Sequence, residues 1–288
     1  MSLVHRRNAP EDDITDSGVH PLDRLLAQGR PIVMGILNLT PDSFADGGRF
    51  DEPTRALAHA KRMIADGADI VDVGGESTRP YPGMDPVSAD EELARVMPVL
   101  PQVVALGVPV SIDTMKASVA ARALAAGATI VNDVWGLQRD PDMAGVVAAH
   151  NVPVVATHNR DTVDPAIDIL ADIEAFFSRS LDIAARAGIA RHRIVLDPGI
   201  GFGKTPEQSL AAIAGLGRLR AFGLPLLVGL SRKRFINAVA PSAPQDRLAG
   251  SIAGNVLAVL EGAAIVRVHD VAETVQALRV AAAIRAAH

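Results

Sequence analysis

Eight short apolar runs alternate with segments of helical periodicity along almost the whole chain. Most runs are rich in β-branched residues and lead into polar or glycine-bearing residues, which is typical of strands buried on both faces. Eight such alternations within about 250 residues predict a (β/α)8 TIM barrel, an α/β fold whose site lies at the carboxyl ends of the strands. The runs are Ile32–Leu37, Ile70–Val73, Val108–Ile112, Thr129–Val131, Val152–Ala156, Ile194–Leu196, Leu226–Leu230 and Ala263–Val268.

The segments between the runs carry helix signals of their own. Ser88 followed by Glu91 forms a capping-box pattern, and Gly188 follows a long helical segment as expected at a helix end. The alternative is a doubly wound open sheet, which usually has fewer strands and a dinucleotide-type glycine turn. The expected helices are Thr54–Asp66, Ser88–Leu106, Lys116–Ala126, Asp142–His150, Ile169–Ala187, Pro206–Leu219, Asp246–Glu261 and Val271–Ala287.

Composition excludes several classes of protein. Apolar residues make up 49% of the chain and aromatic residues only 3%, so small aliphatic side chains must fill the core. The net charge of −5 argues against nucleic acid or an anionic membrane as a partner, and no apolar run is long enough for a membrane span. Cysteine is absent, which excludes disulfides and a thiolate nucleophile. We expect a cytoplasmic protein with a flexible tail over residues 1–20 and one barrel domain over residues 21–288.

Every predicted strand ends in a group that is able to bind a ligand. In a barrel of this type, catalytic residues come from these ends. A helix cap or a solvated turn explains any one of them equally well, and Asp133, Asp270 and Glu76 are read in that way. Capping does not explain all eight, because cations such as Lys233 and Arg267 are unfavourable at a helix N-terminus. The ends are Asn38, Asp72–Arg79, Asp113, Asn132–Asp133, His158, Asp197, Ser231–Lys233, and Arg267 with His269.

One group of strand-end residues is rich in hydrogen-bond acceptors and includes one cation. A carboxylate accepts two parallel N–H bonds well, and the 2-amino-4-oxo edge of a pterin or a guanine presents such a pair of donors. We expect Asp197 to bind this edge, with Asn132 and Asp113 beside it. Lys233 would donate to a ring oxygen or nitrogen.

A second group suits an oxyanion or a diphosphate. It consists of Asn38, Thr78, Arg267 and His269. Arg267 and His269 are two residues apart, so they point to the same side if the strand continues. Mg²⁺ commonly takes one or two protein oxygens together with substrate phosphates, and Asn38 is the candidate for such an oxygen.

Two familiar phosphate-binding motifs are excluded. Gly203–Thr205 reads like the end of a P-loop, but the required first glycine falls on Pro198. Gly199, Gly201 and Gly203 alternate, which is not the spacing of a dinucleotide-binding turn.

Several stretches together resemble the dihydropteroate synthase family of the folate pathway. The similarity covers essentially the whole chain after about residue 20, and its first, second and last motifs are specific. The resemblance implies a barrel that joins 6-hydroxymethyl-7,8-dihydropterin diphosphate to 4-aminobenzoate, requires Mg²⁺, forms a homodimer and is a target of sulfonamides. The matching stretches are Met34–Gly48, Val71–Pro80, Ser111–Thr114, Asn132–Val134, Leu196–Lys204, Gly229–Lys233 and Ala263–Val271.

The family's site residues carry over position by position. Its pterin pocket falls on Asp113, Asn132, Asp197 and Lys233. Its diphosphate contacts fall on Asn38, Thr78, Arg267 and His269, and Asn38 is also the metal ligand. Its aminobenzoate surroundings fall on Phe44, Arg79, Pro80, Gly201, Phe202 and Ser231. The resemblance implies catalytic roles for Asn38, Lys233, Arg267 and His269.

The chain departs from the family pattern at two places. Thr157 and Asn159 flank a histidine where many family members have methionine, which we expect to loosen the apolar floor under the pterin ring. Tyr81 follows Pro80 where glycine is common, which we expect to reshape the aminobenzoate mouth. Two rival functions remain open: a pterin-binding methyltransferase domain acting on a corrinoid protein, and a non-catalytic pterin-binding paralogue.

Overall fold

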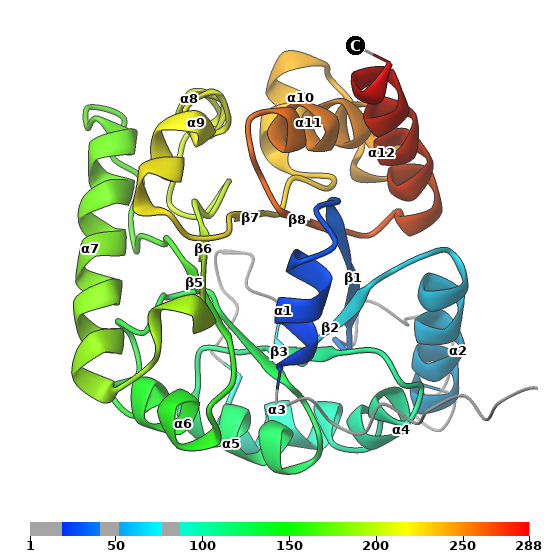
Figure 1. The fold of residues 1–288 in the computed structure, drawn as a ribbon, viewed down its shortest axis with the longest axis vertical. Coiled ribbons are helices and arrows are strands. Elements are labelled where there is room, and N and C mark those ends of the chain that lie inside the picture. Colours follow the sequence, from blue (N-terminus) through cyan, green and yellow to red (C-terminus); the bar gives the residue numbers. More distant parts are fainter. Residues whose placement is uncertain (1–18, 41–51, 77–86, 288) are drawn as a thin grey trace, which may run out of the picture.

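The computed structural model describes residues 19–40, 52–76 and 87–287, which form a ring of parallel strands surrounded by helices (Figure 1). This is the (β/α)8 barrel that the alternation of apolar runs predicts. The open-sheet alternative is wrong. The strands are β1 Ile32–Asn38, β2 Ile70–Gly74, β3 Val110–Asp113, β4 Ile130–Asp133, β5 Val154–Thr157, β6 Ile194–Asp197, β7 Leu227–Val228 and β8 Ile265–Val268.

The strands follow chain order around the ring. Their order is β6-β5-β4-β3-β2-β1-β8-β7, and every paired neighbour is parallel. An isolated parallel bridge between Leu196 and Leu226 brings β6 to β7, and Leu196 N donates to the carbonyl of Pro225 at 3.0 Å. The barrel is therefore nearly closed, with a seam at the short strand β7.

Two apolar layers hold the barrel together. Alternate strand residues point inward or outward. The outward set packs under the surrounding helices, and a smaller inward set fills the barrel. Because both faces are buried, the strands read as continuous apolar runs. The inward cluster includes Ile32, Met34, Ile70, Ile130, Val155, Val195, Leu227 and Ile265.

A short helix that the sequence analysis missed covers the amino end of the barrel. This helix, α1 (Pro21–Leu26), buries Leu22 against the inward cluster (Figure 1). His20 caps it by accepting from Leu22 N at 3.1 Å, and its other ring nitrogen contacts the carbonyl of Thr129 at 3.0 Å. His20 thus has a structural role, although it lies in the stretch expected to be a tail. The remainder of that stretch, residues 1–18, lies outside the described residues.

Most surrounding helices lie within a few residues of the predicted segments, but two predicted helices are broken. The one expected to begin at Ser88 is divided into α3 and α4, because Pro98 lacks the N–H that a continuous helix needs. The next break, between α8 and α9, falls at Gly215, where an added Cβ would lie 2.5 Å from Leu170. The helices are α2 Glu52–Ala65, α3 Ala89–Val96, α4 Leu100–Val104, α5 Ala117–Ala125, α6 Met143–His150, α7 Ile169–Ala187, α8 Pro206–Ala214, α9 Leu216–Leu219, α10 Arg234–Val239, α11 Leu248–Leu260 and α12 Val271–Ala286.

The helix ends follow ordinary capping chemistry. Ser88 accepts from Glu91 N at 3.2 Å, as its sequence pattern predicts. Asp168 caps α7, which ends at Gly188 in the left-handed conformation. No helix within the described ranges is both long enough and apolar enough to cross a bilayer.

We expect Ile112→Ala to destabilise the fold strongly, because Ile112 is fully buried in the layer between β3 and the helices. Truncating a buried isoleucine typically costs about 2–5 kcal/mol through lost burial and the cavity left behind. Urea unfolding measures this loss. Val163→Ala, at a residue 53% exposed, is the control and should change the unfolding free energy by less than about 0.5 kcal/mol. Equal losses in the two variants would contradict this view of the core.

Candidate active site

A layer of polar side chains lies directly above the apolar filling of the barrel, at the carboxyl ends of the strands. On several strands, the residue two positions after an inward apolar residue is polar, and it also points inward. Ile130 is followed in this way by Asn132, and Val195 by Asp197. The members of this layer are Asp72, Asp113, Asn132, Thr157, Asp197 and Arg267, and all except Arg267 are at most 6% exposed.

Arg267 on β8 links two buried carboxylates from neighbouring parts of the ring. Its Nε lies 2.5 Å from Asp72 Oδ2, and its Nη2 lies 2.5 Å from Asp113 Oδ2. Asn132 Nδ2 also donates to Asp72 Oδ2, at 3.1 Å. The sequence analysis gave Asp72 no separate role. Its position two residues after the inward Ile70 was the signal that could have identified it.

This cluster contains one guanidinium for two carboxylates, and burial has the largest effect on the pKa of Asp113. Burial raises the pKa of Asp113 to about 7, and Arg267 opposes the rise only in part. Burial alone would lower the pKa of Arg267, but Asp72 and Asp113 outweigh it and raise that pKa above its ordinary value. Arg267 therefore stays charged, while Asp113 takes up a proton near neutrality.

Several acceptor atoms of the layer are buried and lack a hydrogen-bond partner within the described residues. Buried polar atoms normally have partners, so these atoms are suited to accept hydrogen bonds from a ligand that fills the barrel mouth. The atoms are Asp72 Oδ1, Asp113 Oδ1, Asn132 Oδ1 and the hydroxyl of Thr157. Thr157 thus adds a hydroxyl to the polar layer.

Asp197 and Lys233 lie on the side of the mouth formed by the loop after β6. Asp197 Oδ1 accepts from Gly199 N at 2.8 Å. Burial raises the pKa of Asp197, and the positive charge of Lys233 works against that rise. Lys233 Nζ donates to the carbonyl of Ile200 and lies 4.7 Å from the centre of the Phe202 ring, a cation–π distance. Predicted pterin and aminobenzoate residues therefore meet at this loop.

The three predicted sets of binding residues are joined rather than separate. Arg267, predicted for the diphosphate, contacts Asp113 of the pterin group. Ser231, predicted beside the aminobenzoate, contacts His269 Nδ1 of the diphosphate group at 3.0 Å. Asn38 ends β1 and is half-buried. Phe44, Thr78, Arg79, Pro80 and Tyr81 lie outside the described residues.

Of the strand-end acids that were read as helix caps or turn residues, Asp133 has contacts of that kind and Asp270 does not. Asp133 accepts from Trp135 N and Leu137 N, so it closes a turn. Asp270 is paired with Arg232 instead of capping α12 through its side chain.

The described residues include no cluster of three or more His, Asp or Glu side chains placed to hold a metal ion. Mg²⁺ does not need such a cluster when substrate phosphates supply most of its oxygen ligands. The half-buried amide of Asn38, at the end of a rigid strand, fits that kind of site.

The chain matches known pterin-binding proteins along most of its length. Residues 34–269 match the family described as pterin binding enzymes. The sequence is 51% identical to a dihydropteroate synthase of Bacillus subtilis over 243 residues, which is 84% of each chain.

Solved structures of dihydropteroate synthases are also similar to this chain. One is the dihydropteroate synthase of Clostridium difficile in the presence of pteroic acid, with a TM-score of 0.85, 48% identity and coverage of 88% of this chain and 97% of that one. Another is the Xanthomonas albilineans dihydropteroate synthase with 4-aminobenzoic acid, with a TM-score of 0.85, 45% identity and coverage of 89% and 94%. The chain therefore belongs to the dihydropteroate synthase family of pterin-binding transferases.

Proposed function

We propose that this barrel condenses 6-hydroxymethyl-7,8-dihydropterin diphosphate with 4-aminobenzoate, giving 7,8-dihydropteroate and diphosphate. The observation that carries the proposal is the layer of buried acceptors beside Arg267 at the barrel mouth, which have no partner within the part of the chain that the structure describes. Such a layer suits a flat heterocycle that presents several N–H donors along one edge. Pteroic acid and 4-aminobenzoic acid in the related structures are of the expected ligand classes.

The pterin ring would lie across the carboxylate layer. Asp197 is our choice for its 2-amino edge, because an ionised carboxylate accepts two parallel N–H bonds. Asn132 and Asp113 offer further acceptor oxygens beside it, and Thr157 offers its hydroxyl. Lys233, at the rim of the same pocket, would donate to a ring oxygen or nitrogen.

The diphosphate would lie toward Arg267 and His269. As the C–O bond to the diphosphate breaks, negative charge grows on the leaving group, and fixed positive groups nearby lower the barrier. The methylene carbon is attached to an electron-rich pterin, which stabilises the positive charge left on it. The amine of 4-aminobenzoate then forms the new C–N bond and loses one proton, so no strong general base is needed.

Magnesium fits the diphosphate side of this arrangement. When bound with the diphosphate, Mg²⁺ would act as a Lewis acid on the leaving group, and Asn38 would hold it. Arg267 and His269 have no task in the methyltransferase alternative, which therefore explains less of the site.

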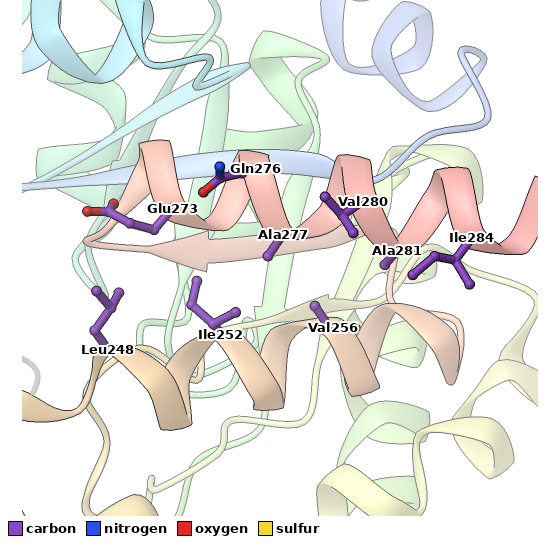
Figure 2. A pocket seen from close by; sticks show the side chains of 9 residues that line it. All are labelled: Leu248, Ile252, Val256, Glu273, Gln276, Ala277, Val280, Ala281 and Ile284. Carbon is purple, nitrogen blue, oxygen red and sulfur yellow. The ribbon is translucent and has the colours of Figure 1, made fainter.

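A second copy of the chain would cover the apolar groove between α11 and α12. The groove, of about 480 Å³, is lined mainly by aliphatic side chains of both helices, which face each other across it (Figure 2). Val280 and Ile284 on α12, with Leu257 and Leu260 on α11, are each at least 43% exposed. Exposed apolar patches commonly mark interfaces, and a two-fold axis would pair the patch with itself.

The expected partners are thus two small substrates and a second copy, with no nucleic acid or membrane. A cytoplasmic location stays a prediction from the sequence.

We expect the purified protein to form dihydropteroate and release diphosphate only when both substrates and Mg²⁺ are present. Asp197→Asn should weaken binding of a pterin that lacks the diphosphate by about 2–4 kcal/mol, because the asparagine amide group would face the ligand's own donors. Product chromatography and calorimetry measure the two effects. Absence of product from the parent protein would defeat the proposed function. Unchanged pterin affinity in Asp197→Asn would move the anchor elsewhere.

We expect the affinity for a bare pterin to fall as the pH drops below about 7, where Asp113 takes up a proton. Only the ionised carboxylate accepts on both oxygens, so affinity should decrease by up to about tenfold per pH unit. Asp113→Asn should bind more weakly at neutral pH and show a flatter profile. Calorimetry across this range provides the test, and a parent affinity that does not change with pH would remove Asp113 from the pterin edge.

We expect Val280→Glu to turn a dimer into a monomer without loss of secondary structure. A buried carboxylate without a partner would cost several kcal/mol per subunit, enough to raise the dimer dissociation constant by about 100-fold or more. Sedimentation equilibrium measures the oligomeric state, and Val163→Glu on another exposed surface is the matched control. A parent protein that sediments as a monomer, or a Val280→Glu variant that stays dimeric, would contradict this assignment.

A further inference from the structure

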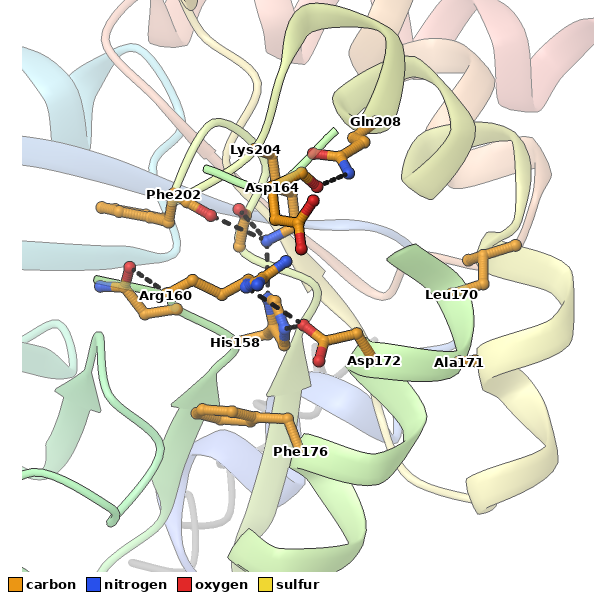
Figure 3. Close-up of polar contacts among 12 residues, drawn as sticks. His158, Arg160, Asp164, Leu170, Ala171, Asp172, Phe176, Phe202, Lys204 and Gln208 are labelled. Atoms are coloured by element: carbon orange, nitrogen blue, oxygen red, sulfur yellow. Dashed lines mark hydrogen bonds and ion pairs between the residues drawn. The ribbon is translucent and has the colours of Figure 1, made fainter. Parts of the chain in front are cut away.

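Three titratable side chains from distant parts of the chain meet beneath the loop that follows β6 (Figure 3). Lys204 ends this loop, His158 follows β5, and Asp172 lies on α7. Lys204 is 7% exposed and His158 is fully buried. None of the three belongs to the sets predicted to bind pterin, diphosphate or aminobenzoate.

The ammonium group of Lys204 has three acceptors around it. Its Nζ lies 2.6 Å from His158 Nδ1, 2.8 Å from the carbonyl of Gly199 and 3.1 Å from the carbonyl of Phe202. An ammonium has three N–H donors and no acceptor. The three contacts therefore use its full donor capacity, and His158 Nδ1 must be the acceptor of the first.

That contact fixes the tautomer of His158. With Nδ1 accepting, the remaining proton sits on Nε2, which lies 3.0 Å from Asp172 Oδ2 and donates to it. Burial, together with the charge of Lys204, lowers the pKa of His158 to about 3, so the ring stays neutral. Its backbone N–H donates to the carbonyl of Asp197 at 2.8 Å, and Phe176 packs edge-on at 4.9 Å between ring centres. The acceptor that faces Lys204 is thus rigidly held.

The two carbonyls bound by Lys204 are the two ends of one tight turn. Phe202 N donates to the carbonyl of Gly199 at 3.0 Å, which closes the turn. Gly199 has φ of +62°, and a Cβ there would lie 1.8 Å from the carbonyl oxygen of His158. The turn therefore lies directly on the His158 backbone, and it carries Gly201 and Phe202, two predicted aminobenzoate residues.

We infer that Lys204 is a positioning residue for 4-aminobenzoate. Its ammonium, oriented by the His158–Asp172 pair, holds the Gly199–Phe202 turn so that Phe202 forms one wall of the aminobenzoate site. The inference rests on the proposed function, because it assigns this turn to one substrate of that reaction. Lys204 itself does not contact the reacting atoms.

The same contacts predict how the turn responds to pH. Burial lowers the pKa of Lys204 to about 7. The negative charges of Asp197 on β6 and Asp172 on α7 raise this pKa, whereas the positive charges of Lys233 after β7 and Arg160 after β5 lower it. His158, also after β5, faces the ammonium as a neutral acceptor. Above that pKa the amine keeps two N–H donors for three acceptors, and one contact is lost. The Michaelis constant for aminobenzoate should therefore rise as the pH increases through about 7.

Lys204→Met tests the inference in steady-state kinetics at saturating pterin diphosphate and Mg²⁺. We expect the Michaelis constant for aminobenzoate to rise by about tenfold or more, because a misplaced wall loosens substrate positioning. The turnover number and the affinity for a bare pterin should stay within about threefold. Lys61→Met, the same change at an exposed lysine of α2, is the matched control. The rise in Michaelis constant above neutral pH should be present in the parent and absent from Lys204→Met.

A pair of substitutions at His158 keeps the test decisive if Lys204→Met does not fold. The amide oxygen of asparagine reaches the place of the ring Nδ1, so His158→Asn keeps the acceptor for Lys204, whereas His158→Leu removes it. We expect His158→Asn to stay within about threefold of the parent Michaelis constant and His158→Leu to exceed it by about tenfold.

Two results would overturn the positioning role. One is an unchanged aminobenzoate Michaelis constant in Lys204→Met. The other is an equal loss of pterin affinity, turnover and aminobenzoate binding, which indicates a general defect of the fold. If Lys204→Met does not fold, equal aminobenzoate Michaelis constants in His158→Asn and His158→Leu would overturn the positioning role. An inactive parent protein would instead defeat the proposed function, so the two failures are distinguishable.

Discussion

The guanidinium of Arg267 lies between two buried carboxylates, 2.5 Å from Asp72 on β2 and 2.5 Å from Asp113 on β3. Taking three charges out of water is costly, and only their mutual contacts offset the cost. These ion pairs therefore join β8 to β2 and β3, which lie beyond β1 in the ring, and make the site part of the fold. Because burial raises its pKa to about 7, Asp113 is ionised only in part near neutrality. A ligand whose donors need the ionised carboxylate must therefore displace that proton.

Because of this arrangement, the predicted diphosphate residues are not separate from the predicted pterin residues. A residue that serves only the leaving group would have its donors open to it, but Arg267 is already bound on two edges of its guanidinium. A guanidinium has five N–H donors, so a diphosphate that recruits Arg267 would use donors other than the two that contact Asp72 and Asp113. The same side chain would then contact both the diphosphate and Asp113. Charge on one substrate group is therefore linked to recognition of the other through one side chain, as in any coupling between sites.

The parts of the site that follow from local patterns were predictable from the sequence. Asp113, Asn132 and Asp197 end apolar runs, and strand ends converge in any parallel barrel, so their meeting required no knowledge of distant contacts. Asp72 was overlooked because it is followed by glycines and reads as the start of a loop, although its spacing from Ile70 places it in the same layer. Lys204 and His158 are 46 positions apart, and no periodicity indicates that contact. The break at Pro98 could have been anticipated, because a proline within a helix removes a backbone donor.

Two lysines hold the loop after β6 in place. Lys233 holds it from the side of the mouth through the carbonyl of Ile200 and the face of Phe202. Lys204 holds it from below through the carbonyls of Gly199 and Phe202. The two lysines differ in burial, so the buried one is costly to charge while the other, at the rim, has readier access to water. A loop fixed at three carbonyls, those of Gly199, Ile200 and Phe202, loses little further conformational entropy when a ligand arrives. Any ordering cost in forming the aminobenzoate site must therefore fall mainly on groups outside this turn.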